Sequence, residues 1–222
     1  MSLSFPFPKK LRFLERKRQK RKQTERKQNK FIMNQQNSSN PFSHLTPLEI
    51  AYIAGFLDGD GTINAQIVKR KDYVLGFQIK VVITFFQSTK RHWFLQQLQK
   101  KLKCGVLRKT DQGMSELTIN GIQLVKPFLE IVSKHLKLKK TQARLVLDIC
   151  QKNKKKLPPK DFLILCKNAD RVGELNDSKK RTVTSDVVQQ HFETVGLLDS
   201  QQNVLLKNVS PVETESDSVF LE

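Results

Sequence analysis

The chain has 222 residues, of which 38% are hydrophobic and 27% are charged, a composition that predicts one core domain with extensions. A formal net charge of +19 favours a polyanionic partner, DNA or RNA, over the alternatives of a basic solvated surface or a ribosome-associated tail. The sequence contains no apolar run of about 18 residues, so we expect no membrane partner. The cysteines and histidines are too scattered to predict a disulfide framework or a zinc site.

The two ends of the chain differ in composition from its middle. Residues 1–45 include a block from Lys9 to Lys30 that is almost entirely lysine, arginine and glutamine. Such a block cannot bury enough apolar surface to fold alone, so we expect a disordered extension and linker. Its functional alternative is an arm that adds phosphate contacts. Residues 193–222 are acidic and rich in serine, and we expect a disordered tail there, which leaves an ordered domain over residues 46–192.

The first predicted element is a helix that begins after a capping box. Thr46-Pro-Leu-Glu49 combines an N-cap threonine, a proline at the first helical position and a glutamate three residues past the cap. We expect this helix to run from Leu48 to about Asp58 and to stop at Gly59 and Gly61. The elements expected next are strands at 62–70 and 75–86, a helix at 88–102 with Trp93, Phe94, Leu98 and Leu102 on its apolar side, strands at 106–110 and 116–120, and helices at 122–132, 140–151, 159–175 and 184–192. This order predicts an α+β domain built on one antiparallel sheet.

The first two predicted strands alternate between apolar and polar residues. Ile63, Ala65 and Ile67 in the first strand, and the odd-numbered positions from Phe77 to Phe85 in the second, belong on a buried face. The opposite face carries amides, hydroxyls and cations, which are the groups that bind base edges, whereas an ordinary polar face would include more carboxylates. We therefore expect DNA to be bound by this face, its turn and the next two strands: Asn64, Gln66, Val68, Arg70, Asp72, Tyr73, Gln78, Lys80, Val82, Thr84, Arg108, Thr110, Glu116 and Thr118.

The segment from Ala51 to Gly61 reads Ala-Tyr-Ile-Ala-Gly-Phe-Leu-Asp-Gly-Asp-Gly. Small residues recur every four positions, which leaves a narrow helix stripe that another backbone could approach closely. Asp60 would lie at the C-terminal end of that helix, where exposed carbonyls and the helix dipole favour a cation. Since the segment occurs once, we expect a two-fold dimer to bring two Asp60 carboxylates together, as metal-dependent phosphodiester hydrolysis requires. The residues expected at the dimer interface are Ala51, Ala54, Gly55 and Asp58.

Ala54-Gly-Phe-Leu-Asp-Gly-Asp-Gly61 resembles the LAGLIDADG motif, and the predicted order of elements is similar to that of the LAGLIDADG endonuclease family. More specifically, the chain resembles the single-motif, homodimeric endonucleases encoded by group I introns of algal chloroplasts. The resemblance covers roughly residues 47–185 and includes the segments 86–94, 135–143 and 175–179. It implies an α-β-β-α-β-β-α fold in which a saddle-shaped antiparallel sheet binds DNA and helices cover its other face.

The resemblance also implies roles for individual residues. Asp60 would be the direct metal ligand, with the carbonyl of Gly59 beside it, and Gln87, Arg91 and Lys139 would surround the metals and the attacking water. Gln87 can orient a water that it cannot deprotonate, and the two cations can offset charge that builds on the phosphate. The implied cofactor is Mg²⁺, for which Mn²⁺ can substitute.

Further positions bear on DNA recognition. Ser178 and Lys179 lie where the family contacts the DNA backbone near the dimer centre. Relatives carry arginine at the position of Thr110 and aspartate at that of Glu116, so we expect a different target sequence and the same chemistry.

The function that these features predict is a site-specific homing endonuclease that makes a double-strand break in a long pseudo-palindromic target and promotes mobility of its host intron. We expect it in an organelle, because no convincing transit peptide precedes the domain. The resemblance implies the chloroplast, and the mitochondrion is the alternative. One alternative is an intron maturase that binds RNA with little or no cleavage, and another is a non-catalytic DNA-binding regulator. Asp60 together with Gln87, Arg91 and Lys139 favours cleavage, because a pure RNA-binding protein needs no metal-binding carboxylate.

Overall fold

The structure is a computed structural model that describes residues 40–153, 157–176 and 181–198. The chain divides into two units, Met1–Leu45 and Thr46–Glu222, and the fold below is that of the second unit. Most of the predicted basic extension, the predicted DNA contacts Ser178 and Lys179, and the tail from residue 199 onward lie outside the described residues.

Helix α2 (Pro47–Asp60) carries the motif segment. Its predicted start is confirmed: the Thr46 hydroxyl accepts a hydrogen bond from the Glu49 N–H at 3.3 Å, and the Glu49 carboxylate accepts one from the Thr46 N–H at 2.9 Å. Its predicted end is wrong, because the helix continues through Gly59 and Asp60 to Gly61. A Cβ at Gly61 would lie 2.6 Å from the Leu57 side chain, so glycine is required where the chain leaves the helix for the first strand.

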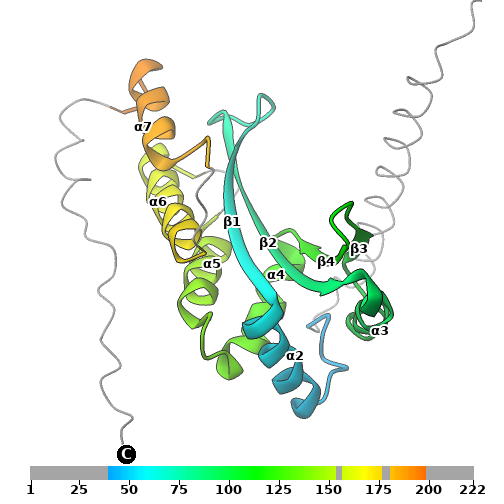
Figure 1. Ribbon diagram of the computed structural model, residues 1–222. Coiled ribbons are helices and arrows are strands. Elements are labelled where there is room, and N and C mark those ends of the chain that lie inside the picture. The colour runs from blue at the N-terminus through cyan, green and yellow to red at the C-terminus, as the bar shows by residue number, and fades with distance from the viewer. Residues whose placement is uncertain (1–39, 154–156, 177–180, 199–222) are drawn as a thin grey trace, which may run out of the picture. The chain divides into compact units, whose positions relative to one another are not determined.

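The sheet has four antiparallel strands in the order β1-β2-β4-β3 (Figure 1). The strands are β1 (Gly61–Lys69), β2 (Phe77–Ser88), β3 (Val106–Lys109) and β4 (Met114–Asn120). The predicted alternation is confirmed, since Ile63, Ala65, Ile67 and the odd-numbered residues of β2 from Phe77 to Phe85 are all buried. Each of these residues is at most 7% exposed, so one face of the sheet forms the core of the domain.

Helices cover the apolar face of the sheet. A short 3-10 turn, η1 (Thr89–Arg91), precedes α3 (His92–Leu102), and α4 (Ile122–Val132) continues into η2 (Ser133–His135). The remaining helices are α5 (Lys140–Lys152), α6 (Pro159–Leu175) and α7 (Ser185–Thr194). Helices α5 and α6 pack along β1, and α4 packs along β2 (Figure 1). The bounds predicted for α4 and α6 are confirmed, and α7 ends at Thr194 instead of residue 192.

The apolar side predicted for α3 is partly wrong. Leu95, Leu98 and Leu102 are buried, whereas Trp93 is exposed. The predicted helix began at Ser88, but the hydroxyl of Ser88 caps the 3-10 turn and the α-helix starts only at His92. Leu95 precedes Leu98 by three residues and Leu102 by seven, so it lies on the same helix face and takes the core position that was predicted for Trp93 and Phe94.

The carboxylate of Asp58 ties the end of α2 to the segment that leads into α5. It accepts hydrogen bonds from the backbone N–H groups of Lys137 at 2.6 Å, Leu138 at 3.3 Å and Lys139 at 3.0 Å. Asp58 is only 8% exposed and Ala54 is fully buried. The sequence places both at a dimer interface, and the structure corrects this, because both side chains face the interior of their own chain.

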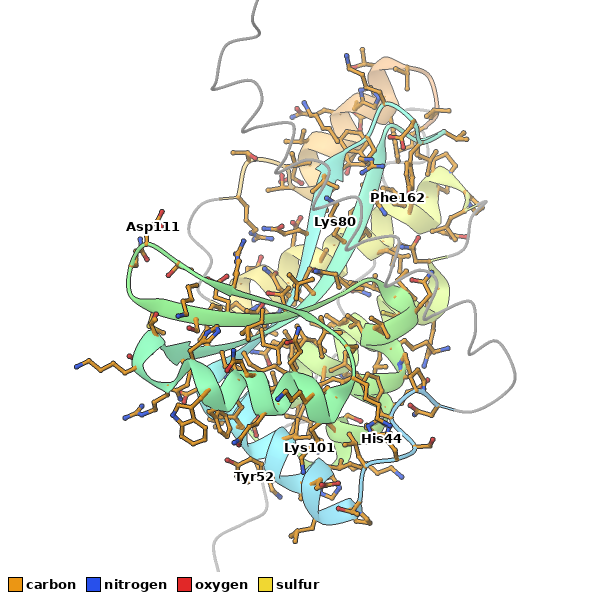
Figure 2. The ribbon with its side chains drawn as sticks, turned by 90° about the vertical axis from the view of Figure 1, so that its right-hand side faces the viewer. His44, Tyr52, Lys80, Lys101, Asp111 and Phe162 are labelled. Carbon is orange, nitrogen blue, oxygen red and sulfur yellow. The ribbon has the colours of Figure 1, made fainter. Side chains whose placement is uncertain are left out.

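We expect Asp58→Ala to lower the free energy of unfolding by about 1–3 kcal/mol, because three backbone donors lose a charged acceptor. Urea denaturation of the full chain measures this change. Asp111→Ala is the matched control, because Asp111 is exposed at the turn between β3 and β4 (Figure 2) and should change stability by no more than about 0.5 kcal/mol. Equal unfolding midpoints for the two variants would show that the Asp58 contacts do not hold the segment.

Candidate active site and nucleic-acid surface

Asp60 is the last residue of α2, and its side chain is exposed. The carbonyls in the last turn of a helix lack intrahelical partners, so the carboxylate lies beside backbone oxygens with negative potential. The side-chain amide of Gln87, near the end of β2, donates a hydrogen bond to the Asp60 carboxylate at 3.2 Å. The junction between α2 and β1 therefore places an accessible carboxylate next to a polar side chain of the neighbouring strand.

Gln87 also connects to a cation. Its side-chain oxygen accepts hydrogen bonds from the Arg91 guanidinium at 3.0 Å and from the Ser88 N–H at 3.1 Å. The amide nitrogen therefore faces the carboxylate and the amide oxygen faces the cation, which sets the orientation of the side chain. A continuous hydrogen-bonded chain runs from Asp60 through Gln87 to Arg91.

Lys139 reaches the same end of α2 from the segment before α5. Its ammonium group donates a hydrogen bond to the backbone carbonyl of Asp58, and its N–H donates to the Asp58 carboxylate at 3.0 Å. Asp58 thus holds both the backbone and the side chain of Lys139. The structure brings the four predicted catalytic residues together from α2, β2, η1 and the segment before α5.

The oxygen atoms around Asp60 suit a hard divalent cation such as Mg²⁺ or Ca²⁺. The donors that the sequence predicts from one chain are the Asp60 carboxylate and the Gly59 carbonyl, both at the end of α2. Within residues 40–153, 157–176 and 181–198, no cluster of three or more His, Cys, Asp or Glu side chains forms a complete metal site. The donor set therefore fits a metal that takes its remaining ligands from water, from phosphate oxygens or from a second copy of the chain.

The predicted polar face is present on the sheet opposite the helices. In the β1–β2 ladder, Gln66 pairs with Lys80 and Val68 pairs with Gln78, and Figure 2 shows Lys80 on this hairpin. Thr84 differs from its neighbours because it is only 9% exposed, and its hydroxyl lies 3.5 Å from that of Thr118 on β4. Thr84 therefore offers little surface to a ligand.

Two residues of this face were not among the predicted contacts. Phe86 follows Val82 and Thr84 at the period of two and pairs with Glu116, so it lies on the polar face and is half-buried. Asn120 is exposed and pairs with Val82. The alternation of the strand places Phe86 on this face, and β2 extends two residues beyond the predicted end, to Ser88.

The β3–β4 hairpin adds a charged pair to the face. The Arg108 guanidinium donates to the Glu116 carboxylate at 2.5 Å, which directs the arginine along the sheet. Thr110 is occupied locally, because its hydroxyl donates to the Met114 carbonyl at 3.2 Å and accepts from the Met114 N–H at 3.3 Å. Thr110 therefore closes the turn and presents little free hydrogen-bonding capacity on the face.

The remaining predicted contacts lie in the loop between β1 and β2. Arg70 and Asp72 form a bidentate ion pair, and the Arg70 guanidinium lies over the ring of Tyr73. In the described part of the chain, no helix is long and apolar enough to cross a membrane.

The comparisons with known proteins agree on one family. Residues 53–151 match the LAGLIDADG endonuclease family. The chain is 44% identical over 149 residues to the DNA endonuclease I-CvuI of Chlorella vulgaris. This alignment covers 67% of this chain and 92% of the relative. The chain is also 38% identical over 142 residues to the DNA endonuclease I-CreI of Chlamydomonas reinhardtii. This second alignment covers 63% of this chain and 86% of the relative.

Solved structures agree with this assignment. A crystal structure of I-CvuI in complex with its target has a TM-score of 0.65 at 42% identity and covers 69% of this chain and 98% of that one. An archaeal intron-encoded homing endonuclease complexed with DNA shares the fold, with a TM-score of 0.59 at 18% identity. The predicted α+β fold and the predicted resemblance are thereby confirmed, and the chain belongs to the LAGLIDADG endonuclease family.

Proposed function

We propose that this chain is a site-specific DNA endonuclease that makes a double-strand break in a long, near-palindromic target. The observation that carries the proposal is the convergence of Asp60, Gln87, Arg91 and Lys139 at one end of a sheet whose open face is polar. A protein that only binds nucleic acid needs such a face but no accessible carboxylate beside two cations. The relatives named DNA endonucleases, one of them crystallised with its target, support the same activity.

The reaction proposed is hydrolysis of a phosphodiester, in which the oxygen of a water bonds to phosphorus and one P–O ester bond breaks. Gln87, held between Asp60 and Arg91, is placed to orient that water by hydrogen bonding. Arg91 and Lys139 carry positive charge toward the phosphate, whose negative charge increases in the transition state. The attacking water releases a proton to solvent, and the leaving oxygen takes one up from solvent.

We propose Mg²⁺, with Mn²⁺ as a substitute, as the cation held by the Asp60 carboxylate and the Gly59 carbonyl. When bound, it would polarise the phosphate and make the neighbouring water more acidic. The presence of Mg or Ca in the crystals of the relative I-CvuI supports the use of a divalent cation.

The exposed side of α2 supports a homodimer. Leu48 is 82% exposed and Tyr52 is 61% exposed, and with Gly55 and Gly59 they follow the i, i+4, i+7, i+11 spacing of one helix face (Tyr52 is labelled in Figure 2). Among the residues that the structure describes, a Cβ at Gly55 or Gly59 would meet no atom within 4 Å outside the backbone of its own helix. Glycine inside a helix is unfavourable by about 0.5–1 kcal/mol relative to alanine. If a second helix packs on this stripe, the absence of side chains at Gly55 and Gly59 allows the two backbones to approach closely. Such packing would also bring two Asp60 carboxylates together.

The length of β1 sets the scale of the target. Nine residues separate Asp60 from the loop at the other end of the strand, which corresponds to about 30 Å of extended chain. At about 3.4 Å per base pair, one half-site then spans roughly nine base pairs, and the target of a dimer spans about twice that.

We propose that cleavage of such a target promotes mobility of a host intron in an organelle. The chloroplast is the first candidate, because the relatives come from algae.

The function is tested by incubating the purified chain with a library of randomised duplexes in Mg²⁺, with Ca²⁺ as the non-cleaving comparison. We expect double-strand breaks at one two-fold-related sequence. Tight binding without cleavage in both Mg²⁺ and Mn²⁺ would instead favour the maturase, and intron RNA would be the next ligand.

Asp60→Asn should reduce the cleavage rate by at least about 100- to 1000-fold, because the variant loses the charge that holds the metal. Binding of the target, measured by gel shift in Ca²⁺, should change little, since Asp60 lies at the end of the sheet and not on its polar face. Asp111→Asn is the control and should cut at the parental rate. A variant that loses binding together with cleavage would contradict this division of roles.

Gln78→Ala should change the preference at one base pair in each half-site, by about 1–3 kcal/mol, because a side-chain amide can make two hydrogen bonds to one base. Lys69→Ala is the matched control: Lys69 pairs with Phe77 and lies on the opposite side of the hairpin. Selection from a randomised library in Ca²⁺ measures both. An equal loss of affinity for all sequences would mean that Gln78 contacts the DNA backbone.

Gly55→Leu should convert a dimer into a monomer without destabilising the protomer, because Gly55 is exposed and a Cβ there would meet no described atom within 4 Å. Sedimentation velocity at several concentrations measures the association, and urea denaturation measures the protomer. Gln190→Leu, which adds an exposed leucine on α7, should leave the association unchanged. The dimer proposal fails if Gly55→Leu sediments as the parent chain does.

A further inference from the structure

The loop between β1 and β2 has a well-defined backbone. The Arg70 N–H donates to the Gly76 carbonyl at 2.8 Å, the Tyr73 N–H donates to the Arg70 carbonyl at 3.2 Å, and the Gly76 N–H donates to the Tyr73 carbonyl at 2.9 Å. Gly76 has a φ of +72°, a conformation that glycine adopts without strain. The loop lies at the end of the hairpin away from α2 (Figure 1), so its side chains leave from a constrained backbone far from Asp60.

One edge of the Arg70 guanidinium is occupied by Asp72. The Nε–H of Arg70 donates to Oδ1 of Asp72 at 3.0 Å and its Nη2–H donates to Oδ2 at 2.9 Å. The Cζ atom of Arg70 lies 5.5 Å from the centre of the Tyr73 ring, close enough for a cation–π contact. Hydrogen bonding within the pair lowers the pKa of Asp72 and raises that of Arg70, so both groups are charged at neutral pH.

The other edge of the guanidinium points away from this pair. A guanidinium has five N–H donors, and Asp72 uses the Nε–H and one Nη2–H. The edge formed by Nη1 and the second Nη2–H remains, and the structure gives Nη1 no hydrogen-bond partner among the described residues. This edge is the fork that matches the N7 and O6 acceptors of guanine in the major groove. The Arg70 side chain is 40% exposed, so a base edge can reach it.

The pair has little value for folding, since exposed ion pairs contribute little to stability. Its physical effect is on the orientation of Arg70. A free arginine side chain samples many rotamers and loses that freedom on binding, whereas a side chain already held in place loses less. By holding one arginine, the Asp72 carboxylate and the Tyr73 ring therefore reduce the entropy that its side chain would lose on binding a ligand.

We propose that Arg70 recognises a guanine near the outer end of each half-site, and that Asp72 and Tyr73 are positioning residues that hold its guanidinium for this contact. The inference rests on the proposed DNA endonuclease function and deepens it by assigning one base. The length of β1 places that base roughly nine base pairs from the centre of the target. Asp72, which the sequence assigns to DNA contact, then acts through Arg70 and does not touch a base.

A second arginine on the sheet offers an internal comparison. Arg108 also uses its Nε and Nη2 atoms to bind a carboxylate, that of Glu116 on β4. Its loop and strand are separate from the β1–β2 loop, so a change at Asp72 should leave the base preference at the position of Arg108 intact.

The test is selection from duplex libraries randomised over the outer base pairs, with the full chain and Ca²⁺, so that binding is measured without cleavage. The parent chain should prefer guanine at one outer position. Arg70→Ala should remove that preference, a change of about 5- to 150-fold, and Arg70→Lys should remove it too, because an ammonium group lacks the planar fork. Asp72→Asn should weaken the guanine preference and raise the affinity for random duplexes, because a negative charge near the phosphates is lost.

Several results would overturn the proposal. A guanine preference that Asp72→Asn leaves intact would show that Asp72 does not position Arg70. Loss of a cytosine preference in Asp72→Asn would make Asp72 itself the reader, through the cytosine N4 amino group. Uniform weakening by Arg70→Ala would place Arg70 on a phosphate. The unfolding midpoints of the variants should equal that of the parent, so a structural defect would be recognised. A parent chain that binds these duplexes without preference at any outer position would refute the guanine assignment, whereas a parent chain that selects no specific sequence from the fully randomised library would refute the endonuclease function itself.

Discussion

The hydrogen bonds of the Asp58 carboxylate are the constraint on which the active site depends. Three successive backbone N–H groups, those of Lys137, Leu138 and Lys139, converge on this carboxylate at the end of α2. The same residue offers its carbonyl to the Lys139 ammonium group, so a cation from the start of α5 is held beside the helix end that carries Asp60. These hydrogen bonds hold Lys139 beside the end of α2, from which the Asp60–Gln87–Arg91 chain begins.

The charges on the polar face follow a simple arrangement. The chain is strongly basic, yet this face and its loop contain carboxylates, at Asp72 and Glu116, and each is bound by an arginine. Pairing removes most of the repulsion between these carboxylates and phosphate groups, and it directs the arginines. The proposed functions therefore separate chemistry from recognition along the hairpin: Asp60 and its neighbouring cations lie at the α2 end, and the oriented Arg70 lies in the loop at the other end.

The glycines of the motif serve different physical purposes. Gly61 is required by its own chain, because a Cβ there would meet Leu57, whereas Gly55 and Gly59 face open space. Two glycines within a helix reduce its stability without any gain inside the protomer. Gly55 and Gly59 therefore lower the stability of α2 and leave room for the close approach of another helix. The proposed dimer needs this close approach.

Features determined by local rules were predictable from the sequence: the capping box at Thr46, the alternation of β1 and β2, and the bounds of α4 and α6. Asp60 was predictable from its place at the end of the motif helix, and Gln87, Arg91 and Lys139 only from the resemblance, whereas the tertiary structure alone showed how they connect. The burial of Ala54, Asp58 and Thr84 depended on contacts distant in sequence. Periodicity gives the face on which a residue lies, but whether a side chain on that face meets solvent or another segment is decided by packing across the whole domain.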